Sequence, residues 1–125
     1  MQLIIFIAVG GAAGSVLRYL VSISMYAWLG HGFPYGTLTV NVLGALVMGF
    51  LTIFLVERFD GMDDILRSLL LIGFLGGFTT FSAFSVETLA QLENGDIHHA
   101  MLNMMLNVGL CLLAAWTGMS IARNL

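Results

Sequence analysis

The residues of this sequence that could do chemistry are polar side chains set within long apolar stretches. Such groups are costly in a membrane span, and they usually face a bundle interior or an aqueous path. Two of these residues are ionisable, Arg18 and Glu87. Neither has a His, Cys or second carboxylate at a spacing typical of acid–base or metal chemistry. We therefore expect hydrogen bonding and ion contact here, and no enzyme. The informative residues are Arg18, Asn41, Thr79, Thr80, Ser82, Ser85, Glu87, Asn103 and Asn107.

Asn103 and Asn107, with Cys111 a further turn along, could form a polar stripe on one helix. Asn103 and Asn107 are four residues apart, so they lie on one face of a helix. Asn41 belongs to an earlier apolar segment, and its amide offers two donors. Hydrogen bonding between packed helices, worth about 0.6 kcal/mol per contact, would explain the same stripe. Ion contact and helix packing both remain open for these residues.

Two phenylalanines, Phe81 and Phe84, project from one helix face. Aromatic residues at this spacing usually pack in a core. The edge of an aromatic ring nevertheless carries the positive part of its quadrupole, so ring edges could solvate an anion. A small hydrated anion also needs a high density of hydrogen-bond donors, which Asn41, Thr80 and Ser82 could supply.

The segment GFLGGFTTFSAFS at 73–85 predicts a helix break near residues 76–80. Each glycine costs a helix about 1 kcal/mol relative to alanine. Unwound backbone at membrane depth is tolerated only in a protein interior or beside a polar cavity, where freed carbonyls can hold ions. An alternative is that Gly73 and Gly77 form a packing face with Gly10 and Gly14. Both interpretations can hold together.

The charged residues near the span ends have ordinary explanations. Arg18 could anchor at an interface by extending its side chain toward water. Glu87 could bond a neighbouring polar helix. Either residue could also bias the entry of an ion. His98 and His99 share a linker with Asp96, which favours simple solvation.

Four apolar segments must position these groups. They run roughly over residues 3–28, 37–56, 65–93 and 98–121. About 20 apolar residues cross a bilayer as a helix. The chain of 125 residues is 59% hydrophobic and 9% charged, whereas a soluble domain carries about a quarter charged residues. We expect an all-α membrane protein with four transmembrane helices in a single domain, residues 1–125.

Charge and cysteine content exclude other classes. The net charge is -3 and lysine is absent, so the basic surface that nucleic acid requires is missing. Cys111 is the sole cysteine and can form no intrachain disulfide.

Arg58, Arg67 and Arg123 all fall on the side of the two termini, so the positive-inside rule favours cytoplasmic termini.

Three motifs together resemble the CrcB/Fluc family of fluoride channels. They are GGAAGSVLRY at 10–19, GTLTVN at 36–41 and GFLGGFTTFSAFS at 73–85. The resemblance covers the whole chain in length, span number and motif order. It implies a dual-topology homodimer of antiparallel subunits in the inner (plasma) membrane of a bacterium, with two fluoride pathways between protomers and a structural sodium ion at the centre. The arginine distribution opposes dual topology.

The resemblance also assigns roles to single residues. Phe81 and Phe84 would offer ring edges to fluoride, Asn41 would donate its amide, and Arg18 would have a vestibule or structural role. The carbonyls of Gly76 and Thr79 would hold the sodium ion. The other residues implied along the fluoride pathway are Thr80, Ser82, Glu87, Asn103 and Asn107.

The sequence departs from the family pattern at two places. Ala83 stands where relatives commonly have threonine, and Asn107 and Cys111 stand where they often have serine. The expected function is passive export of cytoplasmic fluoride, which confers fluoride resistance. A proton-coupled carrier of another small ion, and a scaffold subunit that transports nothing, are the alternatives.

Overall fold

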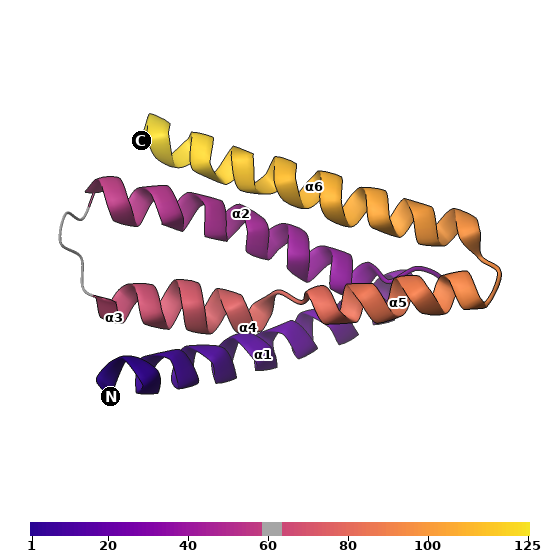
Figure 1. Ribbon diagram of the computed structural model, residues 1–125, viewed down its shortest axis with the longest axis horizontal. Coiled ribbons are helices and arrows are strands. Elements are labelled where there is room, and N and C mark those ends of the chain that lie inside the picture. Colours follow the sequence, from indigo (N-terminus) through magenta and orange to yellow (C-terminus); the bar gives the residue numbers. More distant parts are fainter. Residues whose placement is uncertain (59–63) are drawn as a thin grey trace.

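The computed structural model describes residues 1–58 and 64–125. The predicted linker between the second and third segments overlaps residues 59–63, which lie outside the described part. Figure 1 labels the elements along the chain. They are α1 (Gln2–Leu29), α2 (Tyr35–Arg58), α3 (Asp64–Leu66), η1 (Arg67–Leu75), α4 (Gly76–Phe78), α5 (Phe81–Glu93) and α6 (Ile97–Asn124). The element η1 is a π-helix, in which backbone bonds join residues five apart.

Four helical segments are long and apolar enough to cross a membrane, as the sequence predicts. The third is the composite segment Asp64–Glu93, and the other three are α1, α2 and α6. A helix of 28 residues such as α1 is about 42 Å long, more than the roughly 30 Å of a hydrocarbon core. The predicted set of four membrane-spanning helices is therefore confirmed.

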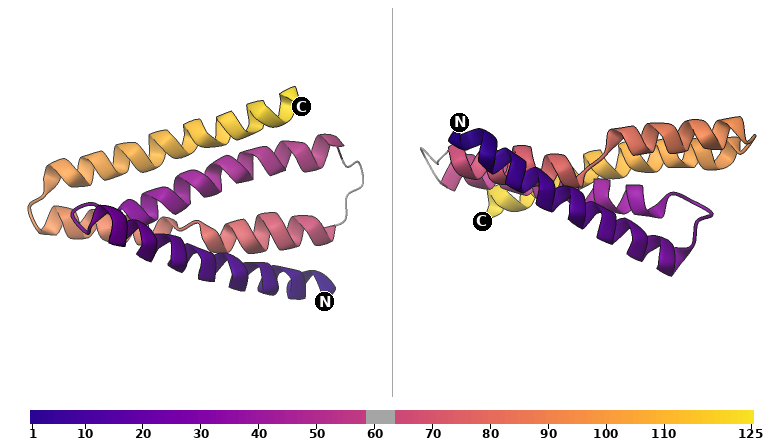
Figure 2. Two further views of the ribbon diagram at one scale, coloured as in Figure 1. Left: turned by 180° about the vertical axis from the view of Figure 1, so that it is seen from behind. Right: turned by 90° about the horizontal axis from the view of Figure 1, so that it is seen from below.

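The helices pack in two main pairs. Helix α2 runs along α6, and α1 runs along η1 and α4 (Figures 1 and 2). Both termini lie at one end of the molecule, together with the end of α2 and the beginning of α3. The linkers over residues 30–34 and 94–96 lie at the opposite end. Figure 2 also shows α1 diverging from α5 and α6 toward that opposite end.

Glycines let α1 approach η1 and α4 backbone to backbone. A Cβ on Gly14 would overlap the carbonyl oxygen of Phe74, and one on Gly73 would come within 2.7 Å of the Ile7 carbonyl. A Cβ on Gly77 would come within 2.6 Å of the Gly11 carbonyl. Small residues of this kind are how membrane helices come close. The packing interpretation of these glycines is therefore correct.

Helices α2 and α6 also approach closely at glycines, in the half of the molecule that carries the termini. A Cβ on Gly49 would overlap the Ala115 carbonyl, and one on Gly118 would overlap the Leu46 carbonyl. The two helices therefore touch along backbone, with no side chain between them at these points.

The helical path is interrupted between α4 and α5. Thr79 (φ -83°, ψ 157°) and Thr80 (φ -151°, ψ 115°) are both extended. Gly76 and Gly77 remain helical within α4, because Gly77 packs against α1. The two residues with extended backbone are therefore Thr79 and Thr80. The Thr80 hydroxyl then caps α5 by accepting from the Ala83 N–H at 3.2 Å.

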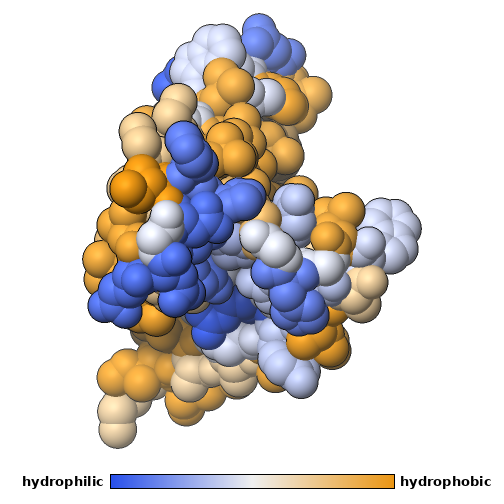
Figure 3. Space-filling view, turned by 90° about the vertical axis from the view of Figure 1, so that its right-hand side faces the viewer, coloured by the Kyte–Doolittle hydropathy of each residue, from blue (hydrophilic) through white to orange (hydrophobic). Residues whose placement is uncertain are grey.

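Large apolar side chains cover much of the exterior. Exposed examples are Trp28 and Leu29 on α1 and Leu112 and Trp116 on α6. A soluble protein could not cover its surface this way, whereas lipid solvates such side chains. Figure 3 views the end of the molecule with linkers 30–34 and 94–96, where hydrophilic residues gather. The polar end and the apolar flanks define a multi-pass membrane protein.

Candidate functional site

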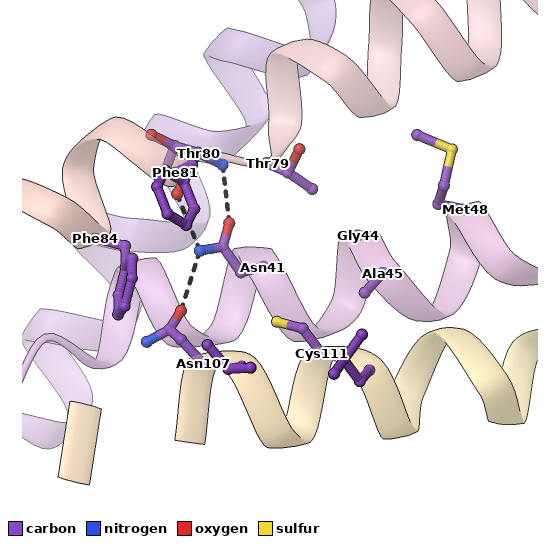
Figure 4. A pocket seen from close by; sticks show the side chains of 12 residues that line it. Asn41, Gly44, Ala45, Met48, Thr79, Thr80, Phe81, Phe84, Asn107 and Cys111 are labelled. Atoms are coloured by element: carbon purple, nitrogen blue, oxygen red, sulfur yellow. Dashed lines mark hydrogen bonds between the residues drawn. The ribbon is translucent and has the colours of Figure 1, made fainter. Parts of the chain in front are cut away.

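One open pocket of ≈ 410 Å³ brings together several of the predicted site residues (Figure 4). It lies between α2, the extended residues 79–80, α5 and α6. None of its lining residues carries a charge. The lining consists of Asn41, Gly44, Ala45, Met48, Thr79, Thr80, Phe81, Phe84, Asn107, Val108, Cys111 and Leu112.

Asn41 clamps the extended backbone at Thr80. Its Oδ1 accepts from the Thr80 N–H at 2.8 Å, and its Nδ2 donates to the Thr80 carbonyl at 3.0 Å. The same Nδ2 donates to Oδ1 of Asn107 at 3.1 Å. An amide nitrogen carries two hydrogens, so both donors of Asn41 already have acceptors within the protein. Asn41 therefore holds the site together.

The hydrogen bonds of the Asn41 side chain and of the Thr80 hydroxyl leave two backbone carbonyls without their helical donors. In a continuous α-helix the Thr80 N–H would bond the Gly76 carbonyl, and the Ala83 N–H would bond the Thr79 carbonyl. Here the Thr80 N–H goes to Asn41 and the Ala83 N–H goes to the Thr80 hydroxyl. The carbonyls of Gly76 and Thr79 thus lose their usual helical donors. These are the two carbonyls that the family resemblance implies as ligands of a sodium ion.

The hydroxyls of Thr80 and Ser82 lie 3.3 Å apart. Whichever hydroxyl donates to the other, one hydrogen of the pair stays available for a further acceptor. Thr80 is buried, whereas Ser82 is exposed. The Thr79 hydroxyl instead donates to the Leu75 carbonyl at 3.0 Å. The pair of Thr80 and Ser82 is therefore the site's source of a neutral donor.

The two phenylalanines line the pocket with different exposure. Phe81 is 75% exposed and Phe84 only 8%. Their ring centroids are 5.4 Å apart and the rings are tilted by 55°. Figure 4 shows both rings among the side chains that line the pocket. An anion in the pocket could thus contact ring edges as well as the hydroxyl pair.

Asn103 and Asn107 extend the polar network along α6. The Nδ2 of Asn107 donates to the side-chain and main-chain oxygens of Asn103, at 2.7 Å and 3.2 Å. Asn103 donates from Nδ2 to the Thr88 hydroxyl at 2.9 Å. Asn107 lines the pocket, whereas Asn103 is fully buried behind it.

Glu87 lies outside the pocket. The Thr37 hydroxyl donates to its Oε1 at 2.8 Å. Its Oε2 and the Oε1 of Gln91 are buried and have no partner among the described residues. Thr37, Thr88 and Gln91 were not among the site residues predicted from the sequence. One signal existed: Thr37 precedes Asn41 by four residues, and Thr88 follows Phe84 by four, so each shares a helix face with a site residue.

The remaining charged candidates are peripheral. Arg18 is partly buried on α1, outside the pocket lining. His98 and His99 are exposed, and Nδ1 of His99 lies 2.6 Å from Asp96, which also caps α6. Within residues 1–58 and 64–125, no group of three or more His, Cys, Asp or Glu side chains could hold a metal ion.

Helical spans surround an uncharged pocket whose lining is mostly apolar, with amide or hydroxyl groups only at Asn41, Thr79, Thr80 and Asn107. The fold and this pocket define the class as a multi-pass membrane protein. Residues 5–119 match the family described as "CrcB-like protein, Camphor Resistance (CrcB)". The match covers most of the chain. The protein therefore belongs to the CrcB family.

Similar proteins carry one shared name, "Fluoride-specific ion channel FluC". The relative from Coxiella burnetii (strain Dugway 5J108-111) is 52% identical over 122 residues, covering 98% of both chains. The Geobacter sulfurreducens relative is 50% identical over the whole of both chains. The Methylococcus capsulatus relative is 50% identical over all of this chain, which spans 55% of that relative's length. The family is one of ion channels and not of enzymes, and this member is a multi-pass protein of the plasma membrane.

Proposed function

We propose that the protein is a fluoride-selective channel through which cytoplasmic fluoride leaves passively, down its electrochemical gradient, so that the cell resists fluoride. The observation that carries this function is the uncharged pocket, whose lining combines the rings of Phe81 and Phe84 with the hydroxyl of Thr80. The Thr80 hydroxyl and the neighbouring Ser82 hydroxyl have one free hydrogen between them. The names of the relatives support fluoride as the ion.

The chemistry of the pocket suits passive flow. A small anion must lose part of its water shell to enter, and the free hydroxyl hydrogen of the Thr80 and Ser82 pair together with the ring edges could replace part of that water. A fixed lysine or arginine would hold the ion too firmly for release, and the lining has neither. Fluoride enters an acid-exposed cell as neutral HF and dissociates inside. An open pathway then lowers internal fluoride without any energy source.

We further propose that two antiparallel subunits form the channel. The pocket is open on one side, and Phe81 leaves most of its ring uncovered at that opening. A second copy would close the opening and complete two equivalent pathways. The described arginines Arg58, Arg67 and Arg123 oppose insertion in both orientations. Labelling of a C-terminal tag from each side of the membrane tests this, since equal labelling is expected and one-sided labelling would contradict it.

A sodium ion would fit at the carbonyls of Gly76 and Thr79. Both have lost their helical donors, and the extended backbone of Thr79 allows its carbonyl to point away from the helix axis. Uncharged oxygen ligands suit a monovalent hard cation, and two copies of the pair would meet at the dimer centre. Replacing sodium by a large organic cation should lower thermal stability; unchanged stability would contradict the assignment.

The decisive experiment is ion efflux from liposomes that hold the purified protein, measured with fluoride and chloride electrodes. Fast electrogenic fluoride efflux with little chloride efflux is expected. Equal rates for the two ions, or no fluoride efflux, would contradict the proposal. A scaffold subunit would give no efflux at all.

One observation favours a second candidate, a proton-coupled transporter. Glu87 has one buried carboxylate oxygen without a partner in the described residues, which is where a proton could reside. Coupled transport requires the flux to follow a pH gradient, whereas a channel needs only a counter-current. The same liposomes with and without a pH gradient distinguish the two.

A further inference from the structure

Five hydrogen bonds run head to tail through the polar half of the molecule. The Thr80 N–H donates to Asn41, whose amide donates to Asn107. Asn107 donates to Asn103, which donates to the Thr88 hydroxyl. The Thr88 hydroxyl donates to the Phe84 carbonyl at 2.7 Å. We call the side chains of Asn41, Asn107, Asn103 and Thr88 the amide relay.

The amide relay begins and ends on the same turn of α5. Thr80 is the N-cap of that helix, and Phe84 lies four residues later. Between these ends the relay passes through Asn41 on α2 and then through Asn107 and Asn103 on α6. It returns to α5 at Thr88. It therefore ties the first turn of α5, which carries Thr80 and Phe84 into the pocket, to two other helices at once.

The direction of the relay is fixed at both ends. A backbone N–H can only donate and a carbonyl can only accept, so every amide between them has one orientation. Turning the amide of Asn41 or Asn107 by 180° would oppose donor to donor and acceptor to acceptor on both sides. Turning the amide of Asn103 would oppose donor to donor on the side of Asn107. Hydrogen-bonded chains in a region of low dielectric also strengthen one another. The relay is thus a single arrangement, not a set of independent bonds.

Two members of the relay are placed too deep to meet an ion in the pocket. Asn103 is 0% exposed and Thr88 is 6% exposed. Neither belongs to the pocket lining, whereas Asn41 and Asn107 do. We propose that Asn103 and Thr88 are positioning residues, which set fluoride selectivity by holding Phe84 and Thr80 in place through the amide relay. This proposal rests on the proposed fluoride channel.

Thr88 offers the sharpest test because its hydroxyl can be removed at almost constant volume. Thr88→Val leaves the Phe84 carbonyl without its side-chain donor. It also leaves one N–H of the Asn103 side-chain amide without an acceptor. The fluoride-to-chloride efflux ratio of the purified, full-length protein in liposomes should fall by about tenfold, the effect of one lost hydrogen bond of ordinary strength. Thr88→Ser keeps the hydroxyl and should keep the wild-type ratio.

Thr117 provides a matched control. Its hydroxyl also donates to the carbonyl four residues earlier, Leu113, at 2.7 Å. Within the described residues, no side chain donates to that hydroxyl, so Thr117 makes the same local bond without a relay. Thr117→Val should therefore leave the efflux ratio unchanged.

A second measurement reports on the relay without any ion flow. Hydrogen exchange of the Thr80 amide, followed by NMR in micelles, should be faster in Thr88→Val than in wild type and in Thr117→Val, since the far end of the relay is loosened. If Thr88→Val does not fold, Thr88→Cys keeps the volume with a weaker donor and should shift both readouts in the same direction by less.

The outcomes separate this proposal from the channel function. A wild-type protein without fluoride preference would contradict the channel, while the Thr80 exchange rates would still test the relay. A wild-type efflux ratio and a wild-type Thr80 exchange rate in Thr88→Val would overturn the relay. A change of equal size in Thr117→Val would overturn it as well, because the local bond alone would then explain the effect.

Discussion

The two halves of the molecule are joined by different means. In the half that carries the termini, glycines bring α1 against η1 and α4, and α2 against α6, backbone to backbone. Beyond Thr79 and Thr80, side-chain hydrogen bonds join α2, α5 and α6: Asn41 donates to the Thr80 carbonyl and to Asn107, and Asn103 donates to Thr88. The first kind of contact depends on the absence of side chains, and the second depends on their chemistry.

This difference separates the tasks of the two halves. A glycine contact fixes how close two helices lie, but it carries no preference for the chemistry nearby. A hydrogen bond fixes direction, and a chain of them fixes which atoms face the pocket. We therefore expect substitutions in the glycine half to change stability alone, whereas substitutions in the polar half change ion selectivity as well.

The largest effect is expected in the glycine half. In Gly14→Ala the new Cβ would overlap the Phe74 carbonyl, and this backbone atom cannot move without separating the helices. The free energy of unfolding in micelles should fall by about 3 kcal/mol, the upper part of the usual range for overpacking. The fraction that remains folded should keep the wild-type efflux ratio.

Gly11→Ala is the control on the same helix. Its Cβ would lie 3.8 Å from the Gly73 carbonyl, an ordinary contact. Replacing glycine by alanine inside a helix should then stabilise the protein by up to about 1 kcal/mol. Equal destabilisation by the two substitutions would show that close backbone contact does not hold this half together.

Asn41→Leu should come next in size. It removes the clamp on Thr80 and the donor to Asn107, leaving three polar groups without partners. The free energy of unfolding should fall by about 2 kcal/mol, since water in the open pocket can pair some of these groups. Fluoride efflux should be lost in the folded fraction too. Asn124→Leu, at the exposed end of α6, should change neither quantity.

Phe84→Ile and Phe81→Ile form a pair within the polar half. Phe84 is buried and Phe81 is exposed, so only Phe84→Ile should reduce the free energy of unfolding, by about 1 kcal/mol. Both substitutions remove a ring edge from the pocket, and both should reduce fluoride efflux. Normal fluoride efflux in both variants would contradict a role for the two ring edges in the fluoride pathway.

Apolar segment length was enough to predict the four spans, because a membrane helix needs no distant partner to satisfy its backbone. The glycine motifs likewise predicted close packing of α1. The extended residues Thr79 and Thr80 lie within the predicted break near residues 76–80, although the glycines that prompted this prediction, Gly76 and Gly77, are helical. Gly77 packs against α1 as part of a helix. The local sequence around the glycines does not show how α1 lies against them.

The partners of the site residues were also beyond sequence reasoning. Asn41 bonds residues 39 and 66 positions away, and such pairs depend on how the helices are rotated. Thr88, Thr52 and Thr117 share one local pattern, a hydroxyl that donates to the carbonyl four residues earlier. Only the packing of α6 gives Thr88 a donor from Asn103. The assignment of single residues to the fluoride pathway stays a prediction.

Glu87→Gln should have the smallest effect, and it tests whether the polar half contains a proton site. A glutamine can still accept from the Thr37 hydroxyl, so the link between α2 and α5 is kept. In a channel, fluoride efflux driven by a counter-current should stay within about twofold of wild type, since the driving force does not pass through this side chain.

The contrary result is equally specific. A coupled transporter would lose its response to the pH gradient in Glu87→Gln, because glutamine cannot exchange a proton. Wild-type efflux that follows the pH gradient, and Glu87→Gln efflux that does not, would assign Glu87 to coupling. The buried Oε2 of Glu87 would then be the proton's position, and the polar half would supply energy coupling in addition to selectivity. Equal pH independence in both proteins would leave Glu87 as a structural link between α2 and α5.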